Sequence, residues 1–129
     1  MILADTNVVF WLAEVPGNLS ESAVAAITEA RHHDGVAISD KTLWELAMMV
    51  SRGRVGVRTS IQEFLREVER YFIVLPITGA IAERSVNFSE NYPKDSTDRL
   101  IGATAIVHGM KLVTADDAIR KSGEVPCVW

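Results

Sequence analysis

Short runs of apolar and β-branched residues alternate along this chain with longer segments whose apolar residues recur at helical spacing. The short runs predict strands at residues 2–4, 36–38, 72–75 and 111–114, and the apolar tail from residue 125 is a candidate fifth strand. The segments between them predict helices over residues 8–12, 20–35, 42–51, 60–68, 80–89, 100–107 and 118–121. Because strands that alternate with helices form parallel units, the pattern predicts an α/β fold. We expect a three-layer α/β/α sandwich with a central parallel sheet of four to five strands.

Turn and capping residues set the boundaries of several predicted helices. Pro16 interrupts the chain after the first helix, Ser20 is a favourable N-cap for the second, and either Ser39 or Asp40 caps the third. No internal repeat, low-complexity tract or linker divides the sequence, so residues 1–129 are expected to form a single domain.

The composition is that of a chain that folds around its own core. With 129 residues, 48% of them hydrophobic, no disulfide or structural metal is needed for folding, and intrinsic disorder is excluded. The single cysteine, Cys127, has no partner for a disulfide or a zinc site. No signal peptide or membrane-spanning apolar run is present, so we expect a cytoplasmic protein without a membrane partner.

Acidic residues fall where three of the predicted strands end. Asp5 follows the first strand directly, Asp116 comes two residues after the fourth, and Glu45 lies on the helix that follows the second. Asp98 lies in the first turn of the apolar helix that precedes the fourth strand. Because ligands of open α/β folds bind outside the carboxyl ends of the strands, these four acids are expected to meet at one edge of the sheet.

Each acid also has a simple structural alternative. Asp5 would equally serve as the cap of the first helix, and Asp98 would favour the dipole of its own helix. Asp116 and Asp117 are both candidates for a turn or cap role, and we expect Asp117 to be the cap and Asp116 the site residue.

Glu45 is the least easily explained as a surface charge. It is the only charged residue between Thr42 and Val50, and Met48 and Met49 flank its stripe of the helix. An ordinary solvent-facing stripe would not carry both methionines, so a site role for Glu45 is favoured over an exposed one.

Four converging carboxylates require a counter-charge. Two such charges 4 Å apart repel by about 4 kcal/mol at an effective dielectric of 20, and no lysine lies beside these positions in sequence. All-oxygen ligands favour hard cations, so Mg²⁺ or Mn²⁺ is the expected cofactor. Because such ions bridge phosphates and activate water, the expected chemistry is hydrolysis of a phosphate ester.

Four segments carry a resemblance to a known family. They read Ile-Leu-Ala-Asp-Thr-Asn at residues 2–7, Thr-Leu-Trp-Glu-Leu at 42–46, Asp-Ser-Thr-Asp-Arg-Leu-Ile-Gly-Ala-Thr-Ala at 95–105 and Leu-Val-Thr-Ala-Asp at 112–116. In order and spacing the chain resembles PIN-domain nucleases, and within them the VapC-like toxins of bacterial and archaeal toxin–antitoxin pairs. The likeness spans almost the whole chain, and only the combination of segments makes it specific.

The resemblance implies roles for individual residues. The acids that match the family's metal ligands are Asp5, Glu45, Asp98 and Asp116. The candidate supporting residues are Thr114 (a hydroxyl near the site), Asn7, Arg99 (the basic residue after the third acid) and Asp95 (a cap rather than a ligand). The chain departs from many relatives at Lys94 and Ser96, where a His or Arg and a Pro are common. This departure affects the expected loop shape and substrate contacts, and it leaves the acids in place.

The resemblance also implies a function and partners. We expect a Mg²⁺- or Mn²⁺-dependent ribonuclease, an endonuclease, that acts as the toxin of a pair, forms a homodimer and binds a small cognate antitoxin. The best basic stretch consists of Arg52, Arg54 and Arg58, which would contact RNA, accept an acidic antitoxin tail or form a solvated loop. The residues that suggest either a partner surface or ordinary core are Trp11, Trp44, Met48 and Met49.

Other function classes fit less well. A phosphoacceptor domain requires an Asp after the third strand, where this chain has Pro76, Ile77 and Thr78. A phosphatase with an aspartyl nucleophile requires Asp-x-Asp after the first strand, where this chain has Asp5, Thr6 and Asn7. A housekeeping PIN nuclease in RNA processing and an inactive metal- or RNA-binding module are the remaining alternatives.

Overall fold

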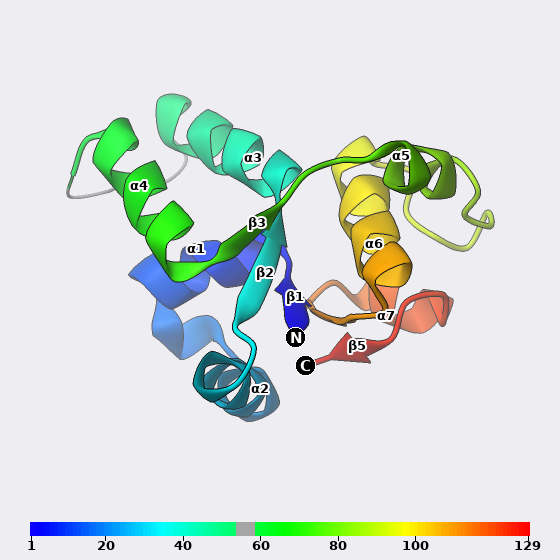
Figure 1. The fold of residues 1–129 in the computed structure, drawn as a ribbon, viewed down its shortest axis with the longest axis horizontal. Coiled ribbons are helices and arrows are strands. Elements are labelled where there is room, and N and C mark those ends of the chain that lie inside the picture. The colour runs from blue at the N-terminus through cyan, green and yellow to red at the C-terminus, as the bar shows by residue number, and fades with distance from the viewer. Residues whose placement is uncertain (54–58) are drawn as a thin grey trace.

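Five parallel strands form the central sheet, in the order β3-β2-β1-β4-β5 (Figure 1). The strands are β1 (Ile2–Ala4), β2 (Val36–Ser39), β3 (Ile73–Leu75), β4 (Lys111–Val113) and β5 (Cys127–Val128). This computed structural model describes residues 1–53 and 59–129, so Arg54 and Arg58 of the predicted basic stretch lie outside the described residues. The predicted parallel sheet is confirmed, and the candidate fifth strand forms at its edge.

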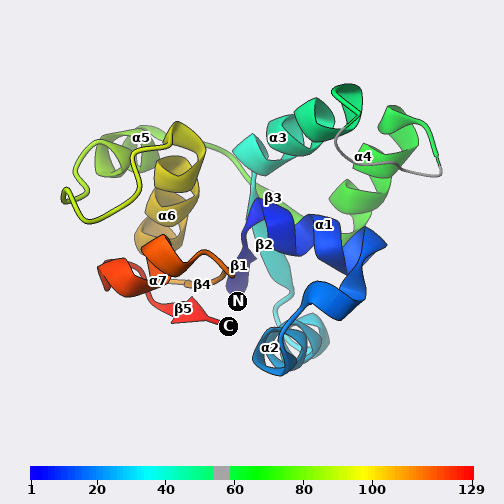
Figure 2. The ribbon, with the colours of Figure 1, turned by 180° about the vertical axis from the view of Figure 1, so that it is seen from behind.

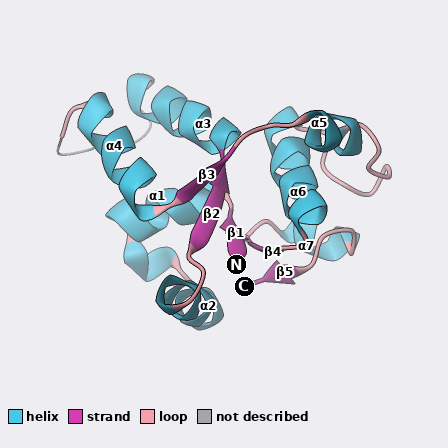
Figure 3. Ribbon diagram, in the orientation of Figure 1, coloured by secondary structure: helices cyan, strands magenta, loops and turns pink. Residues whose placement is uncertain are grey.

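Helices cover both faces of this sheet (Figures 1 and 2). One side carries α1 (Thr6–Glu14), α2 (Glu21–His32), α3 (Asp40–Ser51) and α4 (Ile61–Tyr71), with a 3-10 turn at Pro16–Asn18. The other side carries α5 (Gly79–Ser85), α6 (Ser96–His108) and α7 (Asp117–Ser122). Figure 3 shows the strands enclosed between these two groups of helices, which is the expected three-layer sandwich.

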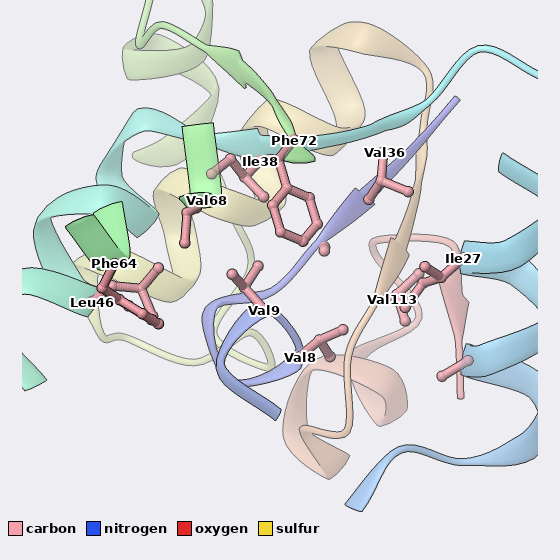
Figure 4. Close-up of a cluster of buried hydrophobic side chains, with 12 residues drawn as sticks. Val8, Val9, Ile27, Val36, Ile38, Leu46, Phe64, Val68, Phe72 and Val113 are labelled. Atoms are coloured by element: carbon pink, nitrogen blue, oxygen red, sulfur yellow. The ribbon is translucent and has the colours of Figure 1, made fainter. Parts of the chain in front are cut away.

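Successive side chains along the strands point to opposite faces of the sheet, so the hydrophobic core has two parts. Leu3 lies in register with Ala37 and Leu112, and all three belong to the core under α5, α6 and α7. Ala4 and Val113, which pair one position further on, belong to the opposite core, which also holds Val8, Val9, Leu46 and Phe64 (Figure 4). Since every residue of β2 is buried, the sheet is covered on both faces, as parallel sheets require.

Several predicted boundaries shift because backbone hydrogen bonds continue or end an element. Phe72 was expected to open the third strand, but its N–H donates to the carbonyl of Val68 at 2.9 Å and so ends α4. The helix expected over residues 80–89 ends at Ser85. The third helix begins earlier than predicted, and Ser39 caps it. No helix among the described residues has both the length and the apolar character needed to cross a membrane.

Candidate active site

Asp5 lies at the carboxyl end of the central strand β1. Its N–H donates to the carbonyl of Val113 at 3.0 Å, which continues the pairing of β1 with β4. One carboxylate oxygen accepts the N–H of Thr6 at 2.8 Å, so Asp5 is the N-cap of α1. The other accepts the hydroxyl of the fully buried Thr114 at 2.7 Å. Both expected roles of Asp5, cap and site residue, are therefore compatible in one side chain.

Asp116 is held at the end of β4 by the same threonine. Its N–H donates to the hydroxyl of Thr114 at 3.1 Å, and its Oδ1 accepts the N–H of Ile119 at 3.0 Å. Asp116 is thus the N-cap of α7, and the prediction that Asp117 fills this role was wrong. The reason is backbone geometry: Asp116 has the extended ψ of 113° that an N-cap needs, whereas Asp117 is already the first helical residue.

Asp98 lies in the first turn of α6, behind a capping residue. Asp95 is the N-cap, as predicted, and its Oδ1 accepts the N–H groups of Thr97 at 2.9 Å and Asp98 at 3.2 Å. The hydroxyl of the buried Tyr92 donates to the backbone carbonyl of Asp98 at 2.7 Å. The backbone of Asp98 is therefore fixed from two sides, which holds its side chain near the ends of β1 and β4.

Glu45 comes from the helix that follows β2. A hydrogen bond of 3.1 Å joins the buried hydroxyls of Thr6 and Thr42, and so ties the start of α1 to α3. Glu45 lies three residues after Thr42, almost one turn further along the same helix. The link between the two helices explains why Glu45 faces the acids at the strand ends.

One cleft of ≈ 510 Å³ brings these side chains together. It contains all four predicted site acids: Asp5, Glu45, Asp98 and Asp116. Its other lining residues are Thr6, Asn7, Trp11, Met49, Asp95 and Ala115. Within the described part of the chain no Lys, Arg or His lines this cleft, so its walls carry only negative formal charge.

The pKa values of two of these acids reflect burial and mutual repulsion. Burial, together with repulsion from neighbouring carboxylates of which Asp5 is the foremost, raises the pKa of Asp98 to about 7. Burial also raises the pKa of Asp5, although hydrogen bonds from Thr114 and the N–H of Thr6 act in the opposite direction. The negative charge therefore lacks compensation within the cleft, which is the condition that a bound cation relieves.

The acidic side chains of the cleft are candidates for holding a divalent cation, but they do not form an enclosed metal cage. Among residues 1–53 and 59–129, no three His, Cys, Asp or Glu side chains already converge closely enough to hold an ion by themselves. Mg²⁺ retains several of its waters and commonly uses one or two direct carboxylates. The carboxylate oxygens of the five acids that line the cleft are ligands of the kind that such an ion prefers.

The remaining predicted residues are spread more widely. Asn7 and Asp95 line the cleft. Thr114 does not line it, but its hydroxyl donates a hydrogen bond to Asp5, which does. Arg99 does not line it, because its Nε donates to the carbonyl of Pro93 at 3.0 Å and the side chain braces the loop before α6. Arg52 is exposed beyond the end of α3.

The cleft also contains apolar residues that sequence reasoning left unassigned between surface and core. Trp11 and Met49 are two of the residues that line it, and Thr6 and Ala115 also line it without having been predicted to do so. Helical spacing could have placed Trp11 and Met49 in the cleft. Trp11 follows Asn7 by four residues and Met49 follows Glu45 by four, so each shares a helix face with a predicted site residue. By contrast, Trp44 lies outside the cleft, 54% exposed, with the ammonium of Lys41 over its ring at 3.9 Å.

Comparison with known proteins identifies the family of this chain. Residues 2–125 match the PIN domain. Ribonuclease VapC22 of Mycobacterium tuberculosis is 33% identical over 119 residues, which is 92% of this chain and 89% of that relative. The chain therefore belongs to the PIN domain family.

Solved structures share the same architecture. A toxin–antitoxin complex from Klebsiella pneumoniae contains a chain that is 25% identical, with a TM-score of 0.65 over 90% of this chain and 87% of that one. VapBC2 from Rickettsia felis, bound to a DNA fragment of its promoter, has a chain with a TM-score of 0.77 at 17% identity, over 98% and 97% of the two chains. At 17% identity the likeness concerns the fold, and it confirms the predicted PIN-like sandwich.

Proposed function

We propose that this protein is a ribonuclease that hydrolyses RNA phosphodiester bonds with the help of Mg²⁺ or Mn²⁺, and that it acts as the toxin of a toxin–antitoxin pair. The observation that carries the proposal is the cleft in which four acids from separate elements meet without a basic side chain among the described residues. A relative that is 33% identical and named a ribonuclease supports the choice of substrate.

The acids that would hold the cation are Asp5, Asp98, Asp116 and Glu45, which all line the cleft. A bound divalent ion supplies positive charge for a phosphate and lowers the pKa of a bound water. The chain itself keeps the donors in place. Thr114 and the N–H of Thr6 fix both oxygens of Asp5, and the capping bond to Ile119 fixes one oxygen of Asp116.

Two supporting features act on the acids indirectly. Asp95 orients the first turn of α6 and so places Asp98, while Arg99 holds the preceding loop through the carbonyl of Pro93. Asn7 is the neutral polar residue of the lining that can both donate and accept a hydrogen bond through its side-chain amide. We assign it to contact with the ribose or phosphate of the substrate.

A cognate antitoxin is the proposed protein partner. A second cleft, of ≈ 700 Å³, lies between α1 and α4 and is lined by apolar residues that include Leu12, Phe64, Val68 and Tyr71. Such a surface suits the apolar face of a partner helix. The toxin–antitoxin complexes among the structural neighbours motivate this choice. A homodimer and a cytoplasmic location, where RNA substrates are available, complete the proposal.

The test is cleavage of structured and unstructured RNAs by purified protein in Mg²⁺, in Mn²⁺ and in excess EDTA. We expect cleavage with either metal and none in EDTA. Undiminished cleavage in EDTA would contradict the metal-dependent mechanism, and no cleavage under any condition would favour an inactive binding module. Expression alone should slow growth of a host, and co-expression with the antitoxin should restore it. Active enzyme with harmless expression would favour a housekeeping nuclease.

A further inference from the structure

Trp11 borders the acidic cleft without belonging to the hydrophobic core. Its indole packs against that of Trp129, with ring centroids 5.9 Å apart and planes inclined by 50°. Trp129 packs against the core shared by α1 to α4. Trp11 is half-buried. Within the part of the chain that the structure describes, it belongs to neither of the two cores and to neither group of apolar side chains packed against them. Trp11 is thus supported by Trp129 and directed to the wall of the cleft.

The two apolar wall residues occupy equivalent positions on their helices. Trp11 follows Asn7 by four residues on α1, and Met49 follows Glu45 by four on α3. Residues four apart lie on the same face of a helix, about 6 Å further along its axis. Each helix therefore presents a polar residue beside the acids and an apolar residue one turn away. The cleft has a charged part and, next to it, a part formed by an indole and a thioether.

This division matters because the protein's own charges oppose binding of RNA. The cleft carries five acidic side chains and, within the described chain, no basic one, and the net charge of the whole sequence is −4. Attraction between the protein and the RNA backbone is therefore weak apart from the contribution of a cation. Stacking of a base on an aromatic ring does not depend on charge, and it is the main charge-independent source of affinity for single strands.

We propose that Trp11 is a stacking platform for one nucleobase of an unpaired RNA segment, next to the phosphate held at the acids, with Met49 as a second apolar contact in the same cleft. Trp129 is a positioning residue that keeps the indole of Trp11 in place. This inference rests on the proposed ribonuclease function and narrows its substrate to RNA that is single-stranded at the cut. Bases paired inside an RNA helix cannot reach such a ring.

Steady-state kinetics on a cleaved single-stranded RNA test the platform. Trp11→Ala should raise KM about tenfold, the size of one lost stacking contact, with a much smaller change in kcat. Trp11→Phe should restore most of the affinity because it keeps an aromatic face. Trp129→Ala should raise KM less, and Trp129→Phe should rescue it. Trp44→Ala is the matched control, because it removes an exposed indole outside the cleft, and it should leave both constants unchanged.

A coupling experiment separates stacking from a merely structural role. A single abasic nucleotide is placed in turn at each position that flanks the cut. At one position the missing base should weaken RNA binding by the parent about tenfold. At that same position it should not weaken RNA binding by Trp11→Ala any further. Equal abasic effects in both proteins, or a lower melting temperature of Trp11→Ala with an unchanged KM, would show that the indole pair only fastens the C-terminal tail and would overturn the proposal.

A fluorescence measurement distinguishes failure of this inference from failure of the proposed function. In the Trp44→Phe/Trp129→Phe protein, Trp11 is the only remaining tryptophan of the three in the sequence. A single-stranded RNA oligonucleotide in Mg²⁺ should quench it. If the parent cleaves no RNA but Trp11 is quenched, the ribonuclease assignment fails and the platform stands. If RNA is cleaved and Trp11 is not quenched, the platform is overturned and the ribonuclease assignment stands.

Discussion

The hydroxyl of Thr114 donates a 2.7 Å hydrogen bond to the carboxylate of Asp5, and so joins residues 109 positions apart in the sequence. The same oxygen accepts the N–H of Asp116 at 3.1 Å. One buried threonine thereby sets the positions of two site acids at the ends of adjacent strands. It also opposes the rise in the pKa of Asp5 that burial causes.

Replacing this hydroxyl tests that role. Thr114→Val keeps the shape of the side chain but leaves the N–H of Asp116 and one oxygen of Asp5 without a partner. The free energy of unfolding in EDTA should fall by about 2 kcal/mol. Cleavage should fall as well, because the pKa of Asp5 rises further and its ionised form becomes less available. Thr114→Ser, which keeps the hydroxyl, is the control and should retain most of the activity. A Thr114→Val protein with parental activity would show that the hydrogen bond is dispensable.

Asp98 should make the stability of the metal-free protein depend on pH. Its pKa is about 7 in the folded protein, against an ordinary value of 3.8, so between these values the folded state binds a proton that the unfolded state does not. The free energy of unfolding in EDTA should therefore fall as pH rises from about 4 to 7. Because the carboxylate is partly exposed and screened by solvent, we expect the contribution to be about 1 kcal/mol. Urea unfolding at pH 5 and pH 8 measures it. The prediction would be contradicted if the free energy of unfolding rose between pH 5 and pH 8, and rose by the same amount in the parent and in Asp98→Asn.

The same substitution should separate stability from function. Asp98→Asn removes one charge from the cleft, so the metal-free fold should be as stable as the parent at pH 8, or about 1 kcal/mol more stable. Cleavage should be severely reduced. Mg²⁺ should raise the melting temperature of the parent more than that of the variant, by mass action. Thermal melts in EDTA and in Mg²⁺, run beside the RNA assay, decide it. Parental cleavage by Asp98→Asn would remove this residue from the site.

Asp116 is the N-cap of α7 and a proposed metal ligand, and two substitutions can separate these roles. Asp116→Asn keeps the capping bond to Ile119 but loses the charge, so cleavage should drop while the melting temperature stays near that of the parent. Asp116→Ala loses both the capping hydrogen bond and the charge, so its free energy of unfolding should also fall by about 1 kcal/mol. Asp117→Asn is the neighbouring control: it disturbs only the exposed pair with Arg120, and should leave cleavage unchanged. Loss of cleavage in Asp117→Asn instead would reverse the assignment of the two residues.

Gly102 lies under the aromatic side chain that fixes Asp98. A Cβ at this position would stand 2.9 Å from Cζ of Tyr92, closer still to its hydroxyl oxygen, and 3.1 Å from Cζ of Phe88. Gly102→Ala should therefore destabilise the protein by about 2 kcal/mol and weaken the bond from Tyr92 to the carbonyl of Asp98. In a Tyr92→Phe background, which removes the hydroxyl, the same substitution should cost less. Equal costs in the two backgrounds would show that the clash lies elsewhere.

The sequence was sufficient to predict the parallel sheet and the grouping of four acids in one cleft, because both depend on the positions of the strands along the chain. Apolar runs mark the buried strands, Asp5 and Asp116 come just after two of them, and Glu45 and Asp98 lie on neighbouring helices. The cap of α7 was misassigned because Asp116 and Asp117 are equivalent in composition and differ only in backbone angle. Two contacts could not be predicted from the sequence: the hydrogen bond from Arg99 to the carbonyl of Pro93, and the packing of Trp11 against Trp129. Each depends on where a loop or tail lies in space, which periodicity does not encode.

The position of β1 in the middle of the sheet has a consequence for when the protein becomes active. Both of its neighbours come later in the chain, and β4 begins only at residue 111. A chain that is still being synthesised already has Asp5 after the residues of β1, but it lacks β4, the Thr114 that follows β4, and Asp116. Long-range pairing of this kind also forms slowly. The acids of the cleft are therefore brought together only after nearly the whole chain has emerged and folded, so the site is assembled at the end of synthesis.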